Sequence, residues 1–262
     1  MYSDLLYEDD LMHKTTRSAT NISNGRDFDI TTETWVKPNT SNFDVHASAK
    51  INGRDAISVV YNSKAADALA AYGLIHKDLK FCKTILLSAI QLAGENLNSS
   101  DSLFVREEVD PTSDLLKAIT LSFIITYGKC YTKADGRKVS LEAKDIFREN
   151  SNLMQVHEFL MHERNNYVAH AGNTSLEAAK TLILLDADES RREVPKLITH
   201  SNHIYAFESF AYKKFLEAIV FTESKLIAMI QKRVKKLQDK ELKGIEDSYL
   251  YNLARKNEAL NL

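Results

Sequence analysis

The chain has few of the features that mark specialised protein classes. Its 262 residues include only two cysteines, Cys82 and Cys130, which cannot form a disulfide framework and whose spacing matches no metal site. No stretch approaches the roughly 18 consecutive apolar residues of a membrane-spanning helix. Residues 1–14 carry acidic side chains where a signal peptide would need basic ones. We therefore expect a cytoplasmic protein in a reducing compartment, without membrane contacts.

The chain also lacks a strong charge of either sign. Its formal net charge is −2, so any contact with nucleic acid would have to use local basic patches rather than the field of the whole protein. Hydrophobic residues make up 44% of the sequence, which is enough to bury a sizeable core. The composition therefore indicates a folded protein with one domain, or one domain with a small appended piece.

The N-terminal quarter of the sequence has the alternation of β-strands. Polar and apolar residues alternate around 28–34 and again around 43–51, and the dipeptide Asn52-Gly53 follows the second run. Asn-Gly suits a two-residue type I′ turn, since both positions need a positive φ. We therefore expect residues 1–62 to form a β-rich extension with an antiparallel hairpin.

From residue 63 onward the hydrophobic pattern is helical. The first predicted helix extends toward Gly94, the second starts at the capping residues Pro111–Asp114, and the third runs from Leu141 with a break near 149–151. A hairpin is expected at about 180–200, followed by a long helix over 202–243 and a shorter helix to the terminus. The predicted fold is mainly α: a bundle of four or five helices over 63–262, with a β-hairpin inserted between the last core helices.

An arginine interrupts the apolar stripe of the third predicted helix, in the stretch HERNNYVAHAGN at 162–173. At about 100° per residue, Arg164 lies roughly 20° from Leu153, in the middle of the stripe. A guanidinium at that place needs a carboxylate, a phosphate or a wet seam between subunits. His170 follows six residues later, near the expected helix end at Ala171-Gly172. A buried ion pair and a histidine at a helix C-terminus would explain both residues without chemistry.

The sequence from Arg164 to His170, RNNYVAH, resembles the R-[N/D/H]-x4-6-H motif of the HEPN superfamily. Many members of that superfamily are helical, metal-independent endoribonucleases of toxin and phage-defence systems. Residues 127–132, YGKCYT, precede the motif helix as in the abortive-infection type branch. The resemblance covers about residues 65–240 and implies a homodimer in which two motifs meet.

The resemblance implies a reaction in which RNA supplies its own nucleophile, the 2′-OH. His170 would act as general acid or base, since an unperturbed histidine titrates near pH 6.5. Arg164 would stabilise the charge that develops on the phosphate, and Asn165 would orient the histidine or a phosphate. The expected products are a 2′,3′-cyclic phosphate and a 5′-OH. We expect neither a metal nor another cofactor.

Several other residues are weaker candidates. The segment 129–140 is predicted to be a basic turn. Two interpretations are open: its basic side chains contact phosphates, or the turn is only solvated. The residues of this segment that could contact RNA are Lys129, Tyr131, Lys133, Arg137 and Lys138. His157, His162 and Glu163 share the motif helix, where the pattern favours solvated side chains. The run KRVKK at 232–236 is expected on the polar face of the long helix.

Three functions remain open from the sequence. The first is the endoribonuclease, acting on RNA as a homodimer with a cognate antitoxin or another defence partner protein. The second is a catalytically silent HEPN dimer that binds a protein or a nucleotide. The third is a helical interaction protein in which the motif is a coincidence. Alanine at His170 separates the first function from the other two.

Overall fold

A computed structural model describes residues 15–20, 29–38, 43–57, 59–96, 111–134, 136–168, 177–185, 187–188, 196–203 and 207–256. The chain divides into two compact units. Unit 1 contains Met1–Ala70 and Ala228–Leu262, and unit 2 contains Ala71–Ile227. The boundary after residue 62 expected from the sequence stays a prediction.

Unit 1 contains an antiparallel sheet in the order β1-β2-β3-β4. Its strands are β1 (Thr15–Thr20), β2 (Asp29–Pro38), β3 (Phe43–Ile51) and β4 (Arg54–Ala56). Asn52 and Gly53 join β3 to β4 with φ values of 51° and 75°. The predicted N-terminal sheet and its hairpin with two positive φ angles are therefore confirmed; Phe28, in the first predicted strand, lies outside the described residues.

The helical part of unit 1 is joined by hydrogen bonds at Ser63. The Ser63 hydroxyl accepts the backbone N–H of Ala66 at 3.1 Å, which caps the start of α1 (Lys64–Asn96). The same hydroxyl donates to the Glu241 carboxylate at 2.6 Å. Glu241 lies in η3 (Gln238–Leu242), a π-helical turn that precedes α6 (Asp247–Lys256).

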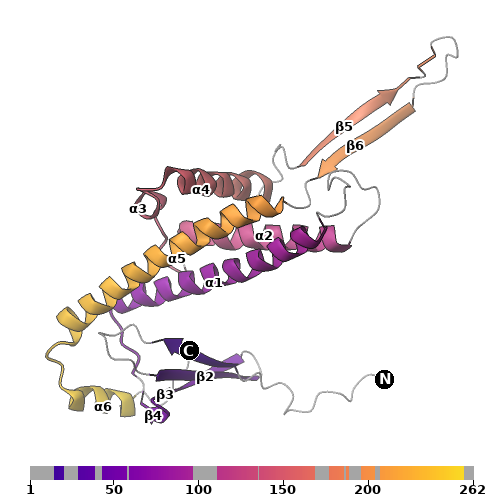
Figure 1. The fold of residues 1–262 in the computed structure, drawn as a ribbon. Helices are drawn as coiled ribbons and strands as arrows, with labels where there is room; N and C mark the ends of the chain where they lie inside the picture. The colour runs from indigo at the N-terminus through magenta and orange to yellow at the C-terminus, as the bar shows by residue number, and fades with distance from the viewer. Residues whose placement is uncertain are drawn as a thin grey trace, which may run out of the picture. The chain divides into compact units, whose positions relative to one another are not determined.

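Unit 2 is a helical bundle (Figure 1). It contains most of α1 and of α5 (Ser209–Leu237), together with α2 (Pro111–Tyr131), α3 (Ala143–Ile146) and α4 (Ser151–Glu163). The turn between α3 and α4 matches the break expected near 149–151, and the Asn150 side chain caps α4 by accepting the N–H of Leu153 at 3.0 Å. The mainly helical architecture predicted from the sequence is confirmed.

The core of unit 2 consists of apolar residues at helical spacing on facing helices. On α1 the fully buried side chains recur every three to four residues, as a helix packed on one side requires. Polar bridges inside this core join α5 to α2, where the Tyr212 and Thr120 hydroxyls are 2.7 Å apart. The largest completely buried side chains of unit 2 are Ile75, Leu79, Leu86, Leu116, Phe123, Ile124, Tyr127, Leu141, Phe147, Leu160, Tyr212 and Ile219.

A β-hairpin separates α4 from α5 in the sequence. Strands β5 (Glu177–Leu184) and β6 (Lys196–His203) pair antiparallel, with Leu182 opposite Ile198 and Ile183 opposite Leu197. The predicted hairpin insertion is confirmed. The long helix that follows starts at Ser209 rather than near residue 202, because the first of these residues belong to β6.

Two further expectations concern the surface of the helices. The basic residues of the 232–236 run are exposed on α5, as expected for a polar face. Within the described ranges, no helix is long and apolar enough to cross a membrane.

Candidate functional site

The candidate site lies where α4 ends and its hydrogen-bonding pattern changes. The backbone N–H of Arg164 bonds to the carbonyls of both Leu160 and Met161. Residues Arg164–Val168 then form the π-helical turn η2, which packs against α2. Short π-helical segments are rare in proteins, and many of those that occur lie at functional sites. The wider turn redirects the side chains that follow. The sequence motif therefore begins at a local departure from α-helical geometry.

The Arg164 side chain lies across Gly128 of α2. A Cβ added at Gly128 would be 2.9 Å from both Cγ and Cδ of Arg164 and 3.1 Å from its Nε. A glycine inside a helix costs about 1 kcal/mol relative to alanine, so a buried helical glycine needs a compensating contact. Here the missing side chain leaves room for the arginine stem. Gly128 belongs to the YGKCYT run that the sequence resemblance associates with the motif helix.

The guanidinium of Arg164 is oriented by its neighbour in the motif. Its Nη1 donates to the Asn165 side-chain oxygen at 2.9 Å, and Arg164 itself is half-buried. Among the residues that the structure describes, no carboxylate forms an ion pair with Arg164. The arginine therefore keeps an uncompensated positive charge within this part of the chain. Asn165, expected to orient His170 or a phosphate, contacts Arg164; His170 lies outside the described residues.

Asn165 and Asn166 are two weak helix formers next to each other in the motif, and the contacts of the Asn166 side chain account for the second of them. Its side-chain nitrogen lies 3.1 Å from the carbonyl oxygen of His162 and 3.0 Å from the Nδ1 of the His162 ring. Side chains that bond to the backbone of the preceding turn compete with regular helix hydrogen bonds. His162 is exposed, as expected. Asn165 and Asn166 thus both make local contacts at the helix end.

Glu163, expected to be solvated, is buried instead. Only 4% of its surface is exposed, and its Oε2 has no hydrogen-bond partner in the described structure. Burial raises the pKa of this carboxyl group, and the charge of His162 partly offsets the effect. The expectation was wrong because Glu163 follows Leu153, His157 and Leu160 on the packed face of α4.

His157 was also expected to be solvated and is buried among aromatic rings. Its Nδ1 lies 2.8 Å from the Tyr127 hydroxyl, and its ring centroid lies 4.4 Å from that of Tyr131 and 5.5 Å from that of Phe147. Burial lowers the pKa of His157 to about 4, because the surrounding rings disfavour the imidazolium. His157 is therefore neutral near pH 7 and part of the core beneath the site.

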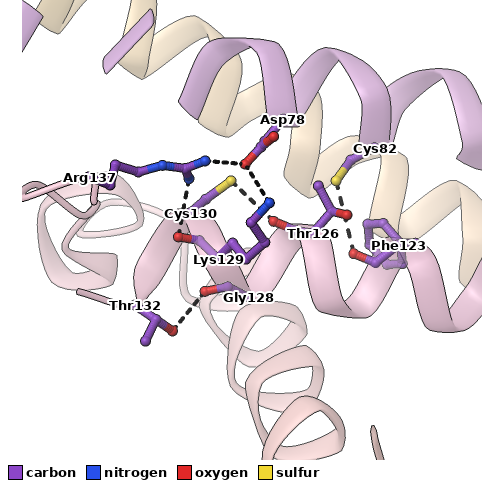
Figure 2. Close-up of polar contacts among 9 residues, drawn as sticks. All are labelled: Asp78, Cys82, Phe123, Thr126, Gly128, Lys129, Cys130, Thr132 and Arg137. Carbon is purple, nitrogen blue, oxygen red and sulfur yellow. Dashed lines mark hydrogen bonds and ion pairs between the residues drawn. The ribbon is translucent and has the colours of Figure 1, made fainter. Parts of the chain in front are cut away.

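Two of the candidate RNA-binding residues are paired with one carboxylate (Figure 2). Asp78 of α1 accepts a hydrogen bond from Nη2 of Arg137 at 2.6 Å and lies 3.7 Å from Nζ of Lys129. The Arg137 side chain also reaches the Lys129 carbonyl at 3.4 Å. One carboxylate thus balances one of these two positive charges, and the cluster fastens the turn after α2 to α1.

The remaining candidates of this turn differ in exposure. Lys133 and Lys138 are exposed, and Lys138 has a φ of +57°. Tyr131 is half-buried: its ring stacks on Phe147 at 6.4 Å between centroids, and its hydroxyl lies 3.0 Å from that of Thr222. Burial raises the Tyr131 pKa.

The two cysteines are free thiols inside the bundle (Figure 2). Cys82 Sγ lies 4.0 Å from the Phe123 carbonyl oxygen, and Cys130 Sγ lies 3.5 Å from that of Thr126. Burial raises both thiol pKa values, that of Cys130 to about 12. These cysteines therefore act as packing residues.

Sequence reasoning missed Gly128 and the burial of Glu163 and His157. The one signal in the sequence that could have identified Gly128 was a glycine inside the apolar pattern of α2. Among the described side chains, no group of three or more histidines, cysteines or acidic residues is placed to hold a metal ion. Comparison with known proteins found no family model that matches the chain, and no significantly similar curated protein or solved structure.

Proposed function

We propose that this chain is a metal-independent endoribonuclease of a toxin or phage-defence system that acts as a homodimer. The observation that carries the proposal is the arrangement of Arg164. Its stem lies on Gly128, its guanidinium is held by Asn165, and no described carboxylate neutralises it. Paired N–H donors in a fixed orientation match the oxygens of a phosphate. The motif resemblance assigns that phosphate to RNA.

In the proposed reaction, the 2′-oxygen of RNA attacks the adjacent phosphorus while the bond from phosphorus to the 5′-oxygen breaks. His170 takes the proton of the 2′-OH or delivers one to the leaving 5′-oxygen. Arg164 stabilises the negative charge that increases on the non-bridging oxygens in the transition state. The products are a 2′,3′-cyclic phosphate on one fragment and a 5′-OH on the other. The role of His170 rests on the sequence motif.

A second copy of the motif completes the proposed site. An arginine that is half-buried and has no described carboxylate partner can contact a phosphate at a two-fold seam between subunits. We expect both Arg164 and both His170 side chains to line one groove. A protein that stays monomeric at micromolar concentration, or in which Arg164 pairs with a carboxylate of its own chain, would contradict this arrangement.

Mixed dimers test whether the site is shared. We would combine an Arg164→Ala subunit with a His170→Ala subunit, each inactive alone, and measure cleavage of a labelled RNA. Partial recovery in the mixture supports a composite site, because the groove then again holds one intact arginine and one intact histidine, from different subunits. Expression in a host adds a second readout: the wild-type chain should arrest growth and the His170→Ala variant should not. A toxic His170→Ala variant would favour the silent binding module.

A further inference from the structure

One short stretch of the chain holds a concentration of positive charge that the overall net charge of −2 conceals. Residues 231–243, QKRVKKLQDKELK, contain six basic and two acidic residues, so their net charge is +4 and the rest of the chain carries −6. The stretch covers the end of α5, all of η3 and the residue that follows, and it lies within unit 1. All six basic side chains are exposed: Lys232, Arg233, Lys235, Lys236, Lys240 and Lys243.

The lysines of this stretch lack compensating carboxylates. Glu241, one of its two acidic residues, accepts a hydrogen bond from the Ser63 hydroxyl at 2.6 Å instead. A helix surface that is merely solvated usually alternates charges of opposite sign, which pair with each other. Segregated positive charge indicates a polyanionic partner. Within the ranges that the structure describes, no carboxylate forms an ion pair with Lys232, Lys235, Lys236, Lys240 or Lys243.

An exposed aromatic ring accompanies these lysines. Tyr249 on α6 is 59% exposed, and Gly244, with a φ of 101°, makes the turn that leads from η3 to α6. Burial raises the pKa of Tyr61, and the Glu241 carboxylate and Tyr249 raise it further, so Tyr61 has both of these side chains as neighbours. Tyr249 therefore lies near η3 and its lysines. Proteins bind single-stranded nucleic acids with this combination, in which cations contact the phosphates and aromatic rings stack on the bases.

A lipid surface fits this stretch less well than a nucleic acid. A basic helix that binds a membrane inserts an apolar face beside its charged one. The apolar side of α5 is already packed in this region: Leu226 and Ile230 are 0% and 5% exposed, and Val234 and Leu237 are half-buried. The end of α5 therefore offers charge to a partner while its apolar side stays within the protein.

We propose that the five lysines and the Tyr249 ring form a lysine–tyrosine surface that binds single-stranded RNA. Such a surface holds a strand with little regard to its sequence, because every phosphate carries the same charge and every base has a face that can stack. The lysine–tyrosine surface belongs to unit 1, whereas Arg164 belongs to unit 2, so binding of the strand and cleavage use different parts of the chain. The inference rests on the proposed function for the choice of RNA as the polyanion.

Fluorescence anisotropy of a labelled oligouridine of about 12 nucleotides tests the lysines in the full chain. Methylation of its 2′-oxygens prevents the proposed cleavage. Lys232→Gln with Lys236→Gln removes two charges one helical turn apart, and this variant should bind at least about tenfold more weakly. The slope of log affinity against log salt should fall by about 1.4, since each contact with a single strand contributes about 0.7. Lys77→Gln with Lys80→Gln on α1 is the matched control, because these lysines are also exposed; it should keep the wild-type slope.

Three tyrosine variants test the aromatic part of the surface. Tyr249→Ala should weaken binding at least about fivefold, whereas Tyr249→Phe keeps a ring that can stack and should bind like the wild type. Tyr251→Ala is the matched control, because its ring is 54% exposed but lies about 200° around α6 from Tyr249. It should also bind like the wild type. Circular dichroism and thermal unfolding should show that all of these variants fold, since every substitution is at an exposed position.

RNA cleavage by the same samples separates this inference from the proposed function. A lysine variant that binds the probe weakly and cleaves RNA with a raised KM and an unchanged kcat supports both. A wild-type chain that binds the probe through this surface but never cleaves RNA supports the inference and contradicts the function.

Several results would overturn the inference. One is a wild-type chain that does not bind the probe; another is a lysine variant that keeps the wild-type affinity and salt slope. A third is a Tyr249→Ala variant that binds as tightly as Tyr249→Phe. Vesicles that contain phosphatidylserine provide the last comparison. If the wild-type chain bound them more tightly than the probe, and the lysine variant did not, the surface would belong to a membrane contact instead.

Discussion

Gly128→Ala should move Arg164 and reveal how tightly the site is held. The new methyl carbon would be 2.9 Å from Cγ and Cδ of Arg164, closer than side-chain carbons approach other atoms. If the arginine swings away, alanine stabilises α2 by about 1 kcal/mol through helix propensity. If the arginine stays, overpacking costs about 1–3 kcal/mol and exceeds that gain. In the first case the guanidinium leaves its position, and cleavage should fall by about 10²- to 10³-fold, as for loss of one transition-state donor. In the second case the loss appears in stability instead.

Gly73→Ala is the control for this substitution. Gly73 also lies inside a helix, and an added Cβ there would meet nothing within 4 Å. It should gain about 1 kcal/mol of stability and keep full activity. Urea unfolding and initial rates of RNA cleavage measure both effects. If Gly128→Ala were stabilised as much as Gly73→Ala and also cleaved RNA at the wild-type rate, Arg164 would not depend on Gly128.

Other substitutions address the charges of the site and the core. His157 has a pKa of about 4 in the folded chain and about 6.5 when unfolded, so its stabilising contribution is complete above pH 6.5. As the pH falls from 6.5 to 4 the free energy of unfolding should decrease by up to about 3 kcal/mol, and His157→Phe should abolish most of this slope in urea titrations. Arg164→Lys should remain folded but lose most cleavage, since an ammonium offers no planar pair of donors. Asn165→Asp should place a carboxylate on Arg164 and weaken RNA binding in a filter assay, whereas Asn165→Ala should weaken it less.

Local patterns in the sequence predicted the elements that depend on neighbouring residues. Alternation and the Asn52-Gly53 dipeptide identified the β3–β4 hairpin, because only the left-handed region suits both turn positions. The break before α4 was also predicted. The motif helix was predicted correctly as far as Glu163, because the chain keeps regular α-helical periodicity up to that residue.

The site itself depended on contacts that a periodic pattern does not contain. A wheel of 100° per residue assumes one helix type, whereas the chain becomes π-helical at Arg164. The wheel placed Arg164 on the packed side but could not show that its stem lies on Gly128, which is 36 positions earlier in the sequence. Nor could it show that Glu163 at the end of α4 is buried with Leu153, His157 and Leu160. These features arise from tertiary packing.

Cleavage of RNA in excess chelator is the most direct test of the proposed mechanism. Purified wild-type chain should cut a susceptible RNA without any divalent ion, leave a 2′,3′-cyclic phosphate and a 5′-OH, and fail on a substrate with 2′-deoxyribose at the cut position. His170→Ala should lower the rate by about 10²- to 10⁴-fold with little change in stability. Activity that disappears in chelator, returns with a divalent ion and survives His170→Ala would contradict the mechanism.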